Sequence, residues 1–314
     1  MILVLSHPQD LHAAAVMHHL AARGETVFLW DLSEFPRAQR LRLACGDAGA
    51  YRLLDTPHGT VDLDEVRSAW WRRPQPYGVD PAVTDPEHYR FAHSECHDAL
   101  AGLWQSLRAT WVNDPVKDEA AGRKSRQLAL AVEVGLRVPR TLITNDPRAA
   151  AAFVAGSPGE RFVYKPFTAT DTAWRETRLV GEAELARLDA IRHAPVIFQE
   201  YVAGPDYRVT LVGDRVFAAE IDARGGAYPV DFRMNLTGAV ARPTVLPGDV
   251  EEGLRRLMQR LGLVYGAADL RRSDATGEFY FLEVNPAGQW LFVEQQAGLP
   301  ISAALADVLA RPPA

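Results

Sequence analysis

The chain has 314 residues, a length that predicts two domains or three lobes at roughly 100–200 residues per domain. Its composition, 47% apolar and 24% charged, is that of a soluble globular protein and excludes wholesale disorder, collagen-like repeats and a disulfide scaffold. The 34 basic and 40 acidic residues give a formal charge of -6, so a strongly basic footprint for duplex nucleic acid is absent and only a local basic groove remains open.

Cysteine usage and the N-terminus indicate a cellular compartment. Cys45 and Cys96 are the two cysteines, they have no metal-ligand spacing, and they favour a reducing environment. The opening MILVLSHPQD has no basic n-region and is not a signal peptide. No apolar run approaches the roughly 18 residues that cross a bilayer. We therefore expect a cytoplasmic protein that binds neither membranes nor nucleic acid.

The first section, residues 1–115, predicts an α/β lobe with a parallel sheet, because a strand, a helix and a second strand open it. The expected strands are 2–5, 25–30, 66–71 and 110–112, and the expected helices are 10–23 and 84–108. His93 and His97 lie one helical turn apart beside Cys96, a spacing that can hold zinc, but Ser94 breaks the metalloprotease motif. We predict a polar helix face there instead.

The remaining chain predicts a central section, 116–195, and a final section, 196–314, with an α+β pattern of many short strands. The expected central elements are helix 118–135, strands 138–144 and 161–165, and a helix from Pro147 capped by Asn145 or Asp146. The expected final elements are strands 196–202, 207–212, 215–221, 264–271 and 278–284 and helices 249–261 and 301–310. The polar stretch 168–177 is a candidate mobile loop.

Oxygen donors gather near the C-terminus. Glu283 and Asn285 are two residues apart in an expected strand, so their side chains leave the same face. Asp269 lies in the expected strand 264–271, which is predicted to be a neighbour of that strand. Two carboxylates and an amide oxygen suit Mg²⁺. A solvated polar strand face is the alternative, but an unpaired Glu283 would be costly within its run of Phe, Leu and Val.

Two lysines and one strand end could meet a nucleotide. Lys165 leaves a buried strand, where it can meet a phosphate as a point charge. Lys124 lies within the expected helix 118–135, a position that usually marks a solvated surface lysine. The strand 196–202 ends in Gln199-Glu200 before Gly204-Pro205, and backbone groups there could pair with an adenine edge.

Taken together, these residues follow one another in an order that resembles the ATP-grasp ligases, and the resemblance covers about residues 113–300. Within that group the chain is similar to the ribosomal-peptide maturases, the graspetide synthetases related to microviridin macrocyclases. The segments that carry the narrower resemblance are Trp70 to Pro74, Gln127 to Ala131 with Gly135-Leu136, Pro139 to Asn145, Asp231-Phe232-Arg233 and Asn285 to Trp290. The fold implied is ATP-grasp, with an N-terminal α/β pre-ATP-grasp domain (1–115), a central subdomain (116–195) and a C-terminal subdomain (196–314).

The resemblance also implies a role for each site residue. ATP phosphates would be held by Lys124 and Lys165, adenine by Gln199, Glu200 and the backbone of Val202, the ribose by Asp206, and Mg²⁺ by Asp269, Glu283 and Asn285. Arg208 and Arg233 would face the γ-phosphate or the substrate carboxylate, although an exposed strand arginine is often a surface ion pair. Asp231 could simply pair with Arg233. The loop 168–177 would fold over the triphosphate.

The implied reaction is ATP-dependent formation of side-chain ester or amide macrocycles in a precursor peptide with a leader and an acidic core, through an acyl phosphate. Two alternatives remain open: a ligase that adds free amino acids to a protein or peptide carboxylate, and a catalytically silent ATP- or peptide-binding module. Relatives of this type suggest a homodimer. Trp70 and Trp71 are expected to pack in the interior, while Arg72 and Arg73 are expected at a solvated rim or as contacts to an acidic peptide.

Overall fold

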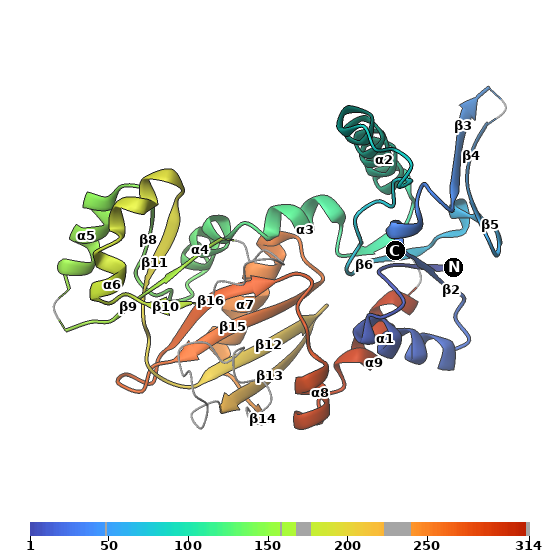
Figure 1. The fold of residues 1–314 in the computed structure, drawn as a ribbon. Coiled ribbons are helices and arrows are strands. Elements are labelled where there is room, and N and C mark those ends of the chain that lie inside the picture. Colours follow the sequence, from blue (N-terminus) through green and yellow to red (C-terminus); the bar gives the residue numbers. More distant parts are fainter. Residues whose placement is uncertain (48, 158, 168–176, 223–239, 312–314) are drawn as a thin grey trace. The chain divides into compact units, whose positions relative to one another are not determined.

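The computed structural model describes residues 1–47, 49–157, 159–167, 177–222 and 240–311 (Figure 1). The chain divides into two compact units. Unit 1 comprises Met1–Glu119, Gly262–Tyr265 and Pro300–Ala314, and unit 2 comprises Ala120–Leu261 and Gly266–Leu299. The three-part division expected from the sequence, with boundaries after residues 115 and 195, stays a prediction. Among the described residues, no helix is both long and apolar enough to span a bilayer.

Unit 1 is built on the expected parallel sheet, whose strands run in the order β2-β1-β6-β7. The strands are β1 (Ile2–Leu5), β2 (Val27–Trp30), β6 (Ser68–Trp71) and β7 (Thr110–Val112). The helices are α1 (Leu11–Ala22), α2 (Pro86–Ser106) and α9 (Ile301–Ala310). Leu3 and Leu5 of β1 share a buried core with Leu100 and Leu103 of α2. Alternate side chains of β1 leave opposite faces, so this core lies on one face of the sheet.

A second, three-stranded antiparallel sheet in unit 1 was not predicted from the sequence. It consists of β3 (Arg40–Gly46), β4 (Gly49–Thr56) and β5 (Gly59–Asp62) in that order. Two short 3₁₀ helices, Leu32–Glu34 and Leu63–Glu65, flank it. Most of β3 is exposed. Its pairing with β4 is supported by backbone hydrogen bonds and by cross-strand pairs such as Arg42 with Asp55, 2.7 Å apart. Leu54 of β4 is buried in the core of unit 1, and Leu41 of β3 packs against that core.

The described residues of unit 2 form two sheets. The first has the order β10-β9-β11-β8 and the second the order β14-β13-β12-β15-β16 (Figure 1). The first comprises β8 (Thr141–Thr144), β9 (Phe162–Lys165), β10 (Arg178–Leu179) and β11 (Val196–Glu200), with α5 (Pro147–Ala155), α6 (Glu182–Leu185) and the 3₁₀ helix Leu188–His193. The second comprises β12 (Asp206–Val212), β13 (Arg215–Asp222), β14 (Val240–Thr244), β15 (Tyr265–Arg272) and β16 (Phe279–Asn285), with α7 (Gly248–Leu261) and α8 (Leu291–Ala297). Asp146 caps α5 by accepting from the Arg148 N–H, so the cap is the second of the two expected residues.

The single helix expected over 118–135 is wrong. The chain forms α3 (Pro115–Ala121) and α4 (Lys124–Glu133), interrupted at Gly122 and Arg123. Glycine is a poor helix former, and Arg123 has an extended backbone, with φ -79° and ψ 105°. The break makes Lys124 the first residue of α4 instead of a residue within a helix.

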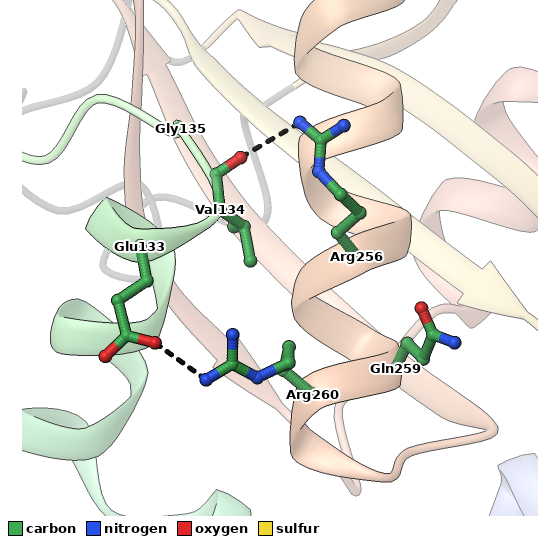
Figure 2. Close-up of a pocket in the computed structure, with 6 residues that line it drawn as sticks. All are labelled: Glu133, Val134, Gly135, Arg256, Gln259 and Arg260. Carbon is green, nitrogen blue, oxygen red and sulfur yellow. Dashed lines mark hydrogen bonds and ion pairs between the residues drawn. The ribbon is translucent and has the colours of Figure 1, made fainter.

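Helices α4 and α7 pack together in unit 2, as Figure 2 shows at the end of α4. Arg256 of α7 donates to the Val134 carbonyl at 2.9 Å, and Arg260 pairs with Glu133 at 2.7 Å. The predicted apolar stripe of α7 is buried: Leu254, Leu257, Met258 and Leu261. A Cβ on Gly266 of β15 would come within 2.9 Å of Met258, so α7 lies directly on the sheet.

Candidate functional site

The three predicted metal ligands lie on adjacent strands of the five-stranded sheet. Asp269 of β15 and Glu283 of β16 are direct register partners, and a β-bulge follows Asp269. Residues opposite each other in an antiparallel pair share a face, and Asn285, two residues further on, shares it too. The structure therefore brings two carboxylates and one amide oxygen to one face of one strand pair.

Two basic side chains meet these carboxylates. Lys124 Nζ lies 2.8 Å from Glu283 Oε2, and Arg208 Nε of β12 lies 2.9 Å from Asp269 Oδ1. Arg208 is buried, and a buried charge is strongly destabilising unless it is paired, so the ion pair with Asp269 stabilises it. Asn285 Oδ1 accepts from the Ala287 N–H at 2.9 Å, which orients the amide just after the strand. Lys124, Arg208, Asp269 and Glu283 thus form one charge-balanced cluster.

Lys165 belongs to a second cluster, on the four-stranded sheet. Its Nζ donates to Gln199 Oε1 at 2.8 Å, and Gln199 Nε2 donates to Thr141 Oγ1 at 2.8 Å. Gln199 is only 2% exposed, so its amide connects Lys165 to Thr141 inside the sheet. This relay fixes the direction of the lysine side chain. The adenine and phosphate roles of Gln199 and Lys165 stay predictions.

The other residues predicted to bind the nucleotide are held by arginines. Glu200 Oε2 lies 3.1 Å from Arg140 Nε. Arg271 donates to both carboxylate oxygens of buried Asp206 at 2.8 Å and to the Val202 carbonyl at 3.3 Å. Arg271 therefore ties the segment after β11 to the start of β12, and it was not singled out from the sequence. The adenine roles of Glu200 and Val202 and the ribose role of Asp206 stay predictions.

Two expectations fall outside the described residues. Arg233, predicted to face the γ-phosphate or the substrate carboxylate, lies within 223–239. Residues 168–176 make up nearly all of the predicted loop over the triphosphate.

Gln127 connects α4 to the predicted metal ligands. Its side chain is 2% exposed and forms hydrogen bonds with the backbone of Val284 in β16, in the way that a neighbouring strand would. Nε2 donates to the Val284 carbonyl at 2.7 Å and to the Ala121 carbonyl at 2.6 Å, and Oε1 accepts from the Val284 N–H at 2.9 Å. Val284 lies between Glu283 and Asn285, so Gln127 fixes the backbone between two predicted ligands. Gln127 and Ala131 are four residues apart in one helix, so the spacing places them on the same helix face. Both side chains are buried in the structure.

In unit 1, Arg72 is not at a solvated rim or exposed to an acidic peptide. It is 1% exposed and pairs with Asp10 at 3.0 Å. Burial pushes the pKa of Asp10 upward, but Arg72, Ser6 and backbone N–H groups outweigh it, so the pKa lies below its usual value. Burial, followed by the charge of Arg72, lowers the pKa of His12 to about 4. Trp70 is buried, as predicted.

Comparisons with known proteins connect this geometry to a family. Residues 1–119 match the family described as the MvdD pre-ATP grasp domain. The structure is similar to that of macrocyclase MdnC from Microcystis aeruginosa MRC, which was solved bound with precursor peptide MdnA. The two share 27% sequence identity and a TM-score of 0.88 over 99% of each chain. The chain has the ATP-grasp fold with a pre-ATP-grasp domain, and over its full length it is similar to ATP-grasp ligases of the graspetide-synthetase type. The expected fold and family resemblance are confirmed.

The chain is also similar to a second solved peptide complex and to two curated proteins that are named as ligases. The RiPP-associated ATP-grasp ligase of Chryseobacterium gregarium, in complex with ADP and a leader and core peptide, has 27% identity and a TM-score of 0.89, covering 98% of this chain and 96% of that one. The probable alpha-L-glutamate ligases of Enterobacter sp. (strain 638) and Klebsiella pneumoniae (strain 342) are 30% and 31% identical. Each alignment covers 61% of this chain and 64% of the relative's length.

Proposed function

We propose that this chain is an ATP-dependent carboxylate ligase that forms side-chain ester or amide macrocycles in a ribosomally made precursor peptide. The observation that carries the proposal is the cluster on β12, β15 and β16. There, Asp269, Glu283 and Asn285 share one face of a strand pair. Asp269 pairs with Arg208, and Glu283 pairs with Lys124. A module that only binds peptide has no need of such a cluster. The full-length similarity to peptide-bound macrocyclases supports a peptide substrate.

The donor set fits Mg²⁺. Two carboxylates and an amide are hard oxygen ligands, and Mg²⁺ is commonly held by one or two carboxylates while substrate phosphates complete its shell. Asp269, Glu283 and Asn285 would hold the ion, which would neutralise phosphate charge. One solved structure of a similar ATP-grasp ligase, PsnB, is a complex with minimal precursor, Mg and ADP. We therefore propose ATP and Mg²⁺ as the nucleotide and metal of this chain.

The chain's own residues would overcome the repulsion between two anions. A substrate Asp or Glu carboxylate attacks the γ-phosphate, ADP leaves, and an acyl phosphate forms. A hydroxyl or amine of the same peptide then displaces phosphate, so the peptide loses one water per ring. Lys124, Lys165 and Arg208 would stabilise negative charge on the transferring phosphoryl group. Arg233 and the loop 168–177 are proposed to assist by contacting substrate and excluding water.

The direct test is the intact mass of a peptide. The purified chain is incubated with Mg-ATP and the acidic peptide encoded beside its gene. Loss of one or more water masses supports the proposal. A gain of residue masses when free amino acids are supplied supports the amino-acid ligase instead.

Glu283→Ala and Asn285→Ala provide the matched controls for that test. Each should abolish peptide-dependent ATP turnover while the protein stays folded. Unchanged turnover in both variants would contradict the metal assignment. Tight ATP binding with no change in peptide mass would refute the macrocyclase assignment.

A further inference from the structure

Unit 1 contains a cavity of about 610 Å³, and none of its lining residues belongs to the charge-balanced cluster. Its walls include the aromatic side chains Trp71, Tyr77 and Trp104. The rings of Trp71 and Trp104 meet edge to face with centroids 6.1 Å apart, so the wall is packed rather than loose. This volume is within the range of small-ligand sites in proteins.

Three carboxylates line the same cavity: Asp114, Asp118 and Glu119. Asp114 is held in place because it accepts from the backbone N–H groups of Val116 and Lys117 at the start of α3. No lysine or arginine is among the cavity's lining residues. The other titratable lining groups are Tyr77 and His97, whose rings are 6.5 Å apart. The cavity is therefore aromatic and, at neutral pH, negatively charged.

Asp118 is the carboxylate least compensated by the protein. The Asn113 amide reaches its Oδ2 at a long 3.4 Å, and no lysine or arginine of the described chain forms an ion pair with it. Burial raises the pKa of Asp118 to about 6, with the Asn113 hydrogen bond opposing the rise. A half-buried carboxylate held so weakly gains most from an external cation.

We propose that this cavity binds the basic side chain, lysine or arginine, of a peptide. An ammonium or guanidinium group can pair with Asp118 while lying against aromatic faces, which attract cations electrostatically. The occupant is a peptide side chain because the proposed function makes a peptide the substrate, and the inference rests on that function. The basic residue would lie outside the acidic segment that reacts, so the cavity would position the peptide without entering the chemistry.

The test measures binding without nucleotide, by calorimetric titration of the full chain with acetyl-Gly-Arg-Gly-amide. The same peptide with citrulline in place of arginine keeps the shape and removes the charge. We expect saturable binding of the arginine peptide and at least about tenfold weaker binding of the citrulline peptide. Free arginine amide should bind more weakly than the tripeptide. Equal affinity for the arginine and citrulline peptides would overturn the proposal, and so would tighter binding of free arginine amide.

Two substitutions localise the binding. Asp118→Asn should weaken the arginine peptide about tenfold, whereas Asp47→Asn, which removes the same charge from an exposed turn, should leave it unchanged. Tyr77→Leu, a second variant in the wall, should weaken it several-fold. Equal loss in Asp118→Asn and Asp47→Asn would show a nonspecific charge effect and refute the site. If the arginine peptide binds at Asp118 but no peptide changes mass with Mg-ATP, the proposed function fails while the site stands.

Discussion

Replacing Asp118 with asparagine should stabilise the protein at neutral pH. Burial raises the pKa of this carboxyl from 3.8 to about 6 in the folded state. A group whose folded pKa is raised contributes its stability below the unfolded pKa and loses it as pH rises through the folded pKa. The shift corresponds to about 3 kcal/mol of lost stability above pH 6, at about 1.36 kcal/mol per pKa unit. Asparagine has the shape of the acid and carries no charge.

The assay is urea unfolding of the wild type and Asp118→Asn at pH 7.5 and at pH 4. At pH 7.5 the variant should be more stable by about 1–3 kcal/mol, the lower bound allowing for residual solvent contact. Near pH 4 the carboxyl is largely protonated in the folded state, so the difference should nearly vanish. A difference that is equal at both pH values, or a variant less stable at pH 7.5, would refute the reasoning. If Asp118→Asn is more stable but binds the peptide more weakly, this carboxylate serves binding at a cost to stability.

Four further predictions concern the two units. Lys165→Ala should bind nucleotide more weakly with the fold retained; thermal stabilisation by Mg-ATP equal to that of the wild type would contradict this. Lys124→Met removes an ion pair that is about a quarter exposed, so the unfolding free energy should change by less than about 1 kcal/mol while Mg-ATP stabilisation is lost. Gln127→Leu leaves the Val284 N–H and carbonyl without this partner, so it should raise the Mg²⁺ concentration needed for turnover. Leu254→Ala is the control: it also destabilises unit 2 but should not change that Mg²⁺ concentration. Asp10→Ala leaves Arg72 buried without its carboxylate and should cost about 3–5 kcal/mol in urea unfolding; a cost below about 1 kcal/mol would show that the pair is dispensable.

Strands that are marked by their own run of residues were predicted correctly. Ile2–Leu5 is a continuous apolar run, and it forms a central strand of a parallel sheet. The alternation in Phe279–Asn285 correctly put Glu283 and Asn285 on one face. The strands of residues 40–62 were missed although Arg40 to Leu43 alternate. Leu41 and Leu54 pack in the core, but Leu43 is exposed, so no regular apolar alternation marks one face.

Contacts between distant residues lay beyond such patterns. Arg72 was expected near solvent because its partner Asp10 is 62 residues away in the chain, and nothing near Arg72 signals a buried charge. Arg271 and Asp206 are 65 residues apart and form a buried pair that no local pattern indicates. The side-chain pairing of Gln127 with Val284 spans 157 residues and substitutes for a strand partner.

The pairing within the cluster would let the proposed metal ligands stay charge-balanced both with and without nucleotide. Asp269 and Glu283 are acidic positions on a sheet face and would repel each other if left alone. Arg208 and Lys124 compensate those charges, at 2.9 and 2.8 Å. If Mg²⁺ took over the carboxylates, it would supply the compensating charge and leave the two basic side chains available to an anion. Phosphates arriving with the metal would be that anion, so the charge balance would be conserved when nucleotide binds. The same argument explains why removing one basic partner should affect nucleotide binding more than folding.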